Sequence, residues 1–181
     1  PGSNYTNTRH NIGFKIIDAI NSHFKLSKQK PKFKGLLTTG NIDEKKIYAI
    51  KPLTFMNNSG TAIKELIDYF KIEAKNVIVF HDDMDIDFGK IKAKFGGSSA
   101  GHNGIESIDK FIGKDYSRVR IGIGHPKQKK RVNNHVLEDF KEDEEEKIKE
   151  ITENIVRQIP TLIDKKMDLF SSKVNQNLNW I

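Results

Sequence analysis

A short apolar segment, NVIVF at residues 76–80, restricts the possible folds more than any other part of the chain. It is rich in β-branched residues, which is typical of a strand that is covered on both faces. Segments with helical periodicity lie on both sides of it along the chain. This alternation of strands and helices predicts an α/β fold, in which helices pack on the faces of a sheet.

Apolar residues recur at helical spacing in three segments, which predicts three amphipathic helices. They are Ile12, Ile16, Ile17, Ile20 and Phe24 in the first, Ile63, Leu66, Ile67 and Phe70 in the second, and Ile148, Ile151, Ile155, Ile159 and Leu162 in a third, long helix. We also expect a short helix at 105–112, ended by Gly113, and a last one from Asp168.

Further strands are expected at KIYAI (46–50), KIKAKF (90–95) and RVRIGIG (118–124). The strand at 90–95 alternates, with Ile91, Ala93 and Phe95 on one side, so it should be half-exposed beside buried strands. We therefore predict an α/β fold in one three-layer domain over residues 1–181, with a twisted, mostly parallel mixed sheet flanked by helices.

Composition excludes several classes of protein. The 181 residues contain no cysteine, which rules out disulfides, zinc–thiolate sites and cysteine nucleophiles. No apolar run is long enough to span a bilayer and no secretory signal is visible, so we expect a cytoplasmic location. The net charge of +7 fits either a lysine-rich solvated surface or a polyanionic partner such as RNA. Its uneven distribution, with HPKQKKR basic and EDFKEDEEE acidic, favours a basic face.

Four loop segments concentrate polar side chains and histidines: NTRHNIGF, KPLTFMNNSG, FHDDMD and FGGSSAGHNG. Each lies at a predicted strand end or helix start, where rigid elements hold binding and catalytic residues. His10 is either a capping or exposed histidine, or a general base, because imidazole titrates near neutral pH. A base needs an orienting carboxylate, and Asp82, directly after the buried strand, is the best-placed candidate.

The acidic cluster HDDMDID at 81–87 does not match a known metal loop. A calcium loop starting at Asp83 would need glycine and glutamate where Phe88 and Lys94 stand. A magnesium site stays possible, but FGGSSAGHNG lacks the ending of a phosphate-binding P-loop. We expect no metal, and we expect Asp83, Asp85 and Asp87 to form a solvated turn. The amides of Asn57 and Asn103 could donate to an oxyanion, although asparagine more often occupies turns and caps.

The segments TRHNIGF, KPLTFMNNSG, HDDMDIDFGKIKAKFGG, GHNGIESI and RVRIGIGHP together resemble the bacterial-type peptidyl-tRNA hydrolase family, in order and spacing. The resemblance runs from Pro1 to about Phe140. It implies a carboxylic ester hydrolase that needs no cofactor and cleaves peptide from the terminal adenosine of peptidyl-tRNA, which recycles the tRNA for translation. It also implies a monomer that contacts the acceptor stem.

The resemblance assigns roles to ten residues. His10 is the catalytic base and Asp82 holds its imidazole. The expected substrate-binding residues are Tyr5, Phe55, Met56, Asn57 and Asn103. The expected contacts to tRNA phosphates are Lys94, Arg120 and Lys129. A general base acting on water suffices for an activated ester, so the chemistry requires no metal.

The chain departs from the family pattern at its start. The family begins with an apolar strand ending in Asn-Pro-Gly, whereas this chain begins at Pro1-Gly2. We expect that the natural protein is longer and includes that strand and its substrate-binding asparagine. Two alternatives are a non-catalytic RNA-binding module on the same scaffold and a magnesium-dependent phosphatase that uses the acidic cluster.

Overall fold

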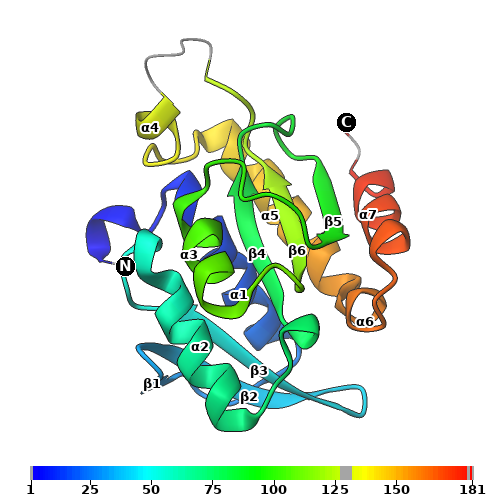
Figure 1. Ribbon diagram of the computed structural model, residues 1–181. Helices are drawn as coiled ribbons and strands as arrows, with labels where there is room; N and C mark the ends of the chain where they lie inside the picture. The colour runs from blue at the N-terminus through cyan, green and yellow to red at the C-terminus, as the bar shows by residue number, and fades with distance from the viewer. Residues whose placement is uncertain (1, 127–131, 179, 181) are drawn as a thin grey trace. The chain divides into compact units, whose positions relative to one another are not determined.

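The computed structural model describes residues 2–126, 132–178 and 180, shown as a ribbon in Figure 1. Backbone contacts divide the chain into two compact units. The first comprises residues 20–79 and 95–117, and the second comprises residues 2–19, 80–94 and 118–181. No helix of the described residues is long and apolar enough to cross a membrane.

The first unit contains an antiparallel sheet of β1 (Lys30–Lys32), β2 (Gly35–Ile42) and β3 (Lys45–Pro52), in that order. Strands β2 and β3 form a hairpin that pairs Ile42 with Lys45 across a two-residue turn. Asp43 in this turn has a φ of +50°, a conformation that aspartate tolerates better than most residues. The sequence pattern had predicted β3 but not its partner β2.

Two helices of the first unit, α2 (Ser59–Phe70) and α3 (Asn103–Ile112), lie side by side (Figure 1). Gly60 permits the close approach, since a Cβ atom there would collide with the Ser107 carbonyl. Its N–H donates to the Ser107 hydroxyl at 3.0 Å. The helices contribute to one buried core with a strand residue and a tyrosine; its members are Leu37, Ile63, Leu66, Ile67, Ile108 and Tyr116.

The second sheet has the order β4 (Ile78–Asp83), β6 (Ser117–Gly122), β5 (Ile91–Phe95), and most of its residues belong to the second unit. The Ser117 N–H donates to the Val77 carbonyl, and the Ile123 N–H donates to the Asp83 carbonyl. Residue numbers therefore rise in the same direction along β4 and β6, so the two strands are parallel. Along β5 and β6, Gly96 bonds Tyr116 and Lys90 bonds Gly122, so the residue numbers run in opposite directions, as in antiparallel strands. The expected mixed sheet flanked by helices is therefore confirmed, with more antiparallel pairing than the sequence had suggested.

Burial along β4 differs from the prediction. Its apolar residues Ile78, Val79 and Phe80 are only half-buried, whereas His81, Asp82 and Asp83 are buried. Within the described part of the chain β4 pairs with β6 alone, so it is an edge strand. The carboxylates thus lie within the strand and do not follow it.

The outer edge of β5 is covered by α7 (Met167–Gln176), which lies beside this strand in Figure 1. The Asn175 side chain bonds both the N–H and the C=O of Ile91 at 2.9 Å, and the Ser171 hydroxyl accepts from Ala93 N–H at 2.8 Å. Side chains one helical turn apart thereby satisfy an edge that would otherwise be open. Ile91 and Ala93 of β5 are buried and Lys92 between them is exposed, as the predicted alternation requires, whereas Phe95 at the end of the strand is 53% exposed.

The expected long helix through Leu162 is two helices, α5 (Glu142–Arg157) and α6 (Ile159–Ile163). Pro160 lies in the first turn of α6 and has no N–H to continue the α5 bonding pattern. Two further helices of the described residues are α1 (Ile12–His23) and α4 (Val132–His135). Short 3₁₀ turns occur at Ser3–Tyr5, Arg9–Asn11, Met56–Asn58 and Ala74–Asn76.

Candidate active site

The second unit brings His10 and Asp82 together. The Nδ1 atom of His10 lies 2.8 Å from Oδ1 of Asp82, and the side chains are 14% and 2% exposed. A carboxylate can only accept a hydrogen bond, so Nδ1–H donates and a neutral His10 carries its lone pair on Nε2. This is the tautomer that a general base acting through Nε2 requires.

A segment distant in sequence holds the backbone around His10. The His10 N–H donates to the Val136 carbonyl at 2.8 Å, and the Arg9 N–H donates to the Glu138 carbonyl at 3.0 Å. Thr8 forms an isolated antiparallel bridge with Asp139. These bonds fix where α1 begins and therefore where the imidazole is placed.

The Arg9 guanidinium adds contacts to the same segment, residues 136–139, which we call the clamp. It is buried, bonds Glu144 at 2.6 Å and also donates to the Asp139 carbonyl. Its centre lies 5.0 Å from that of the Phe140 ring, within the range of a cation–π contact. Sequence inspection did not identify Arg9 as a positioning residue, because its partners lie about 130 residues away.

Asp83 has a structural partner that the sequence analysis missed. Its Oδ2 accepts from Arg120 Nε at 2.7 Å, and its Oδ1 accepts from the Asp85 N–H at 2.9 Å. The expectation of a solvated turn is therefore wrong for Asp83, which is buried. It holds for Asp85 and Asp87, which are exposed.

The first unit gathers a second group of predicted residues. Met56 and Asn57 form the 3₁₀ turn before α2, and Asn103 is the first residue of α3. These two helix starts are adjacent, since a Cβ atom on Gly104 would lie 2.6 Å from Met56 Sδ. Asn57 and Asn103 are exposed, so their amides are accessible to a ligand.

The cap of α3 is His102 and not Asn103. Nδ1 of His102 accepts from the N–H groups of Gly104 and Ile105 at 3.1 and 3.2 Å. Histidine is uncommon as a helix cap, so the sequence pattern did not indicate that His102 has this role. Because His102 satisfies the backbone at the helix start, the Asn103 side chain is not required for capping.

The other predicted residues occupy the following places. Tyr5 and Phe55 are exposed, at 41% and 73%. Lys94 and Arg120 lie on the neighbouring strands β5 and β6, and Lys129 lies outside the described residues.

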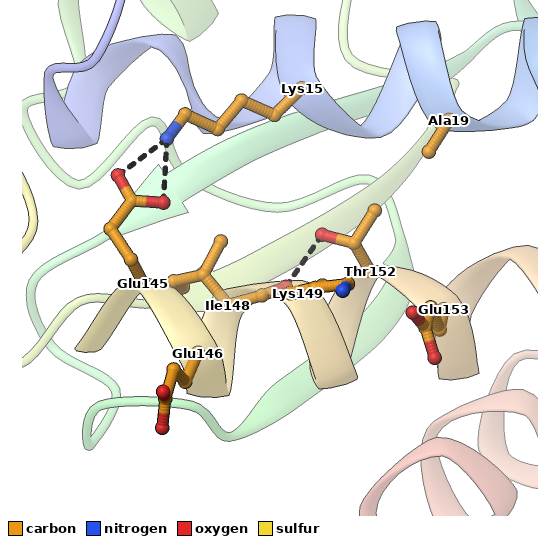
Figure 2. A pocket seen from close by; sticks show the side chains of 8 residues that line it. All are labelled: Lys15, Ala19, Glu145, Glu146, Ile148, Lys149, Thr152 and Glu153. Carbon is orange, nitrogen blue, oxygen red and sulfur yellow. Dashed lines mark hydrogen bonds and ion pairs between the residues drawn. The ribbon is translucent and has the colours of Figure 1, made fainter. Parts of the chain in front are cut away.

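A groove of about 580 Å³ runs between α1 and α5 in the second unit (Figure 2). Lys15 reaches across it to both carboxylate oxygens of Glu145, at 2.7 and 3.1 Å. Glu146 and Glu153 add negative charge to the lining of the groove, and Lys149 adds one positive charge. None of the nine predicted site residues that the structure describes lines this groove, and its carboxylates would repel a polyanion.

Comparison with known proteins identifies the class of protein. The sequence model of the family described as peptidyl-tRNA hydrolase matches residues 1–180. The chain therefore belongs to the peptidyl-tRNA hydrolase family, and it is a hydrolase that cleaves the ester bond of peptidyl-tRNA.

Individual relatives agree with this assignment. The peptidyl-tRNA hydrolase of Pelagibacter ubique is 71% identical over 97% of this chain and 94% of its own length. That of Ehrlichia canis is 44% identical, over 99% of this chain and 92% of its own. The crystal structure of peptidyl-tRNA hydrolase from Acinetobacter baumannii superposes with a TM-score of 0.90 at 32% identity, covering 97% of this chain and 90% of that one.

Proposed function

We propose that His10 is the general base of this hydrolase and that Asp82 orients it. The observation that carries the proposal is the 2.8 Å bond between His10 Nδ1 and the buried Asp82 carboxylate. It supports a neutral imidazole with its lone pair on Nε2, and it provides a negative charge beside the imidazolium that forms during reaction.

The proposed reaction uses water as the nucleophile. His10 Nε2 removes a proton from the water while its oxygen bonds to the ester carbonyl carbon. The resulting oxyanion accepts hydrogen bonds from amide donors, for which we propose Asn57 and Asn103; one such donor is worth roughly 3 kcal/mol in comparable sites. The tetrahedral intermediate then breaks its bond to the ribose oxygen, which takes the proton from the imidazolium.

The remaining assignments follow from the family resemblance. We propose that Tyr5, Phe55 and Met56 bind the peptide and the terminal nucleotide. Lys94, Arg120 and Lys129 are proposed to contact tRNA phosphates of the acceptor stem, which gives affinity without base readout. We further propose that the protein acts as a monomer in the cytoplasm, where translation generates peptidyl-tRNA.

An acyl-enzyme trap tests the proposed attack by water. During turnover of N-acetyl-aminoacyl-tRNA, the denatured enzyme should show no added acyl mass, because no side chain forms a covalent bond. In H₂¹⁸O the released carboxylate should gain one ¹⁸O atom, and the tRNA should gain none. A serine esterase with an activated ester serves as the positive control. Stoichiometric acylation of the protein would contradict direct attack by water.

Removing one proposed phosphate contact should weaken tRNA binding without slowing the chemistry. For Lys94→Gln we expect the slope of log Kd against log salt to fall by about 1. The cleavage rate of the same acyl group on a CCA trinucleotide should change less than twofold. An equal loss of activity on both substrates would show that Lys94 does not act through the tRNA body.

The corresponding variant Arg120→Gln should also lower the stability of the fold. It removes the partner of the buried Asp83 carboxylate, so it should lower the unfolding temperature as well as the affinity for tRNA. Lys94 is therefore the cleaner of the two positions for measuring a phosphate contact.

A further inference from the structure

The edge strand β1 of the first unit and the segment just before it carry a row of lysines to which the proposed function assigns no role. Lys28, Lys30 and Lys32 alternate along KQKPK, and all three are exposed. We propose that this β1 lysine row is a second tRNA-contacting surface that binds phosphates of the tRNA body. It differs from the contacts proposed for Lys94 and Arg120, which belong to the second unit.

The geometry of β1 suits a run of phosphates. All three residues of β1 are exposed, and among the described residues the strand pairs with β2 alone. Alternate residues of a strand share a face, so Lys30 and Lys32 project to the same side at a spacing of about 6.8 Å. Consecutive phosphates of a nucleic-acid strand are separated by a similar distance. Pro31 between them stiffens the backbone, because its ring fixes φ.

Aromatic rings hold one of these lysines in place. Lys32 Nζ lies 4.2 Å from the centre of the Tyr69 ring, 4.8 Å from that of Phe33 and 5.8 Å from that of Phe70. The rings pack against each other, with Phe33 5.2 Å from Tyr69 and 5.7 Å from Phe70. A lysine fixed by its surroundings loses less conformational entropy when it binds an anion.

The local charge is positive. Lys34 pairs with Glu65 at 2.6 Å, and Lys64 pairs with Asp68 at 2.7 Å. Within the described ranges, no carboxylate pairs with the three lysines of the row. Their charges therefore remain available to a polyanion, and the substrate of this enzyme is one.

Lysines on an edge strand also prevent edge-to-edge association of sheets. That role requires charge at the edge but not a lysine fixed over three aromatic rings. The two roles differ in a measurable way, because only phosphate binding makes the affinity for tRNA depend on these residues.

The test uses Lys28→Gln/Lys30→Gln/Lys32→Gln and a matched control, Lys165→Gln/Lys166→Gln/Lys173→Gln, which removes the same charge from exposed positions. For the row variant we expect the slope of log Kd against log salt to fall by about 2 to 3, and kcat/KM on N-acetyl-aminoacyl-tRNA to fall roughly tenfold at low salt. Cleavage of the acylated CCA trinucleotide should change less than twofold. The trinucleotide lacks the tRNA body, so its cleavage rate reports the chemical step alone. An error in the proposed role of His10 would therefore be detected independently of tRNA binding by the lysine row.

The proposal is overturned if the row variant and the control variant have the same salt slope, or if the trinucleotide loses as much activity as the tRNA. A second measurement does not depend on the folding of a variant. Acetylation of the unmodified protein, with and without deacylated tRNA, should show protection of Lys28, Lys30 and Lys32 relative to Lys165, Lys166 and Lys173. Equal labelling of the row in both conditions also overturns it.

Discussion

Replacing His10 with alanine should lower kcat on peptidyl-tRNA by at least a hundredfold and up to roughly 10⁴-fold. The variant loses the group that removes the proton from water. The affinity for deacylated tRNA should change less than threefold, because His10 makes no proposed contact to the tRNA body.

The matched control for this variant is His23→Ala, at an exposed position at the end of α1. It should retain activity within about twofold. Circular dichroism and the unfolding temperature establish that both variants fold. Turnover by a folded His10→Ala protein at a third or more of the normal rate would remove His10 from the mechanism.

Asp82→Asn should lower kcat by roughly 10²- to 10⁴-fold with little change in KM. The carboxylate can only accept from Nδ1–H, whereas the asparagine amide can donate to Nδ1 and stabilise the tautomer with its proton on Nε2. The substitution also removes the negative charge beside the imidazolium. Steady-state kinetics on N-acetyl-aminoacyl-tRNA measure both parameters.

The acidic cluster itself supplies the control for Asp82. Asp85→Asn changes an exposed carboxylate three residues away, so kcat should stay within about twofold of normal. A similar loss in both variants would indicate a general effect of charge in the cluster. A normal kcat for Asp82→Asn would mean that the 2.8 Å bond to His10 has no catalytic role.

Local sequence patterns predicted most elements of the fold. Periodicity located α1, α2, α3 and α5, and the end of α3 followed from Gly113, whose φ is +77°. The hairpin strand β2 was missed because GLLTTGNI alternates weakly between apolar and polar residues. Burial along β4 was also mispredicted, because burial depends on how many neighbours a strand has, and a single strand does not encode that number.

The pair of His10 and Asp82 was the part of the candidate site that could be predicted from the residue types and their places in the sequence. A histidine at a helix start and an aspartate at a strand end suggested a base and its orienting group, and the structure brings these side chains together. The clamp from Val136 to Asp139 was not predictable, because its bonds to Thr8, Arg9 and His10 are made by backbone groups. The partner of Asp83 was missed for a related reason, since Arg120 lies 37 residues away on another strand.

Chemical rescue of His10→Ala tests the central claim most directly. Imidazole added to the variant should restore cleavage of N-acetyl-aminoacyl-tRNA, because a free base can occupy the vacated space beside Asp82 and accept the proton from water. Among substituted imidazoles of similar size, the restored rate should rise with the basicity of the ring nitrogen. A folded, tRNA-binding variant that stays inactive at every imidazole concentration, or whose rate is independent of basicity, would contradict general-base catalysis by His10.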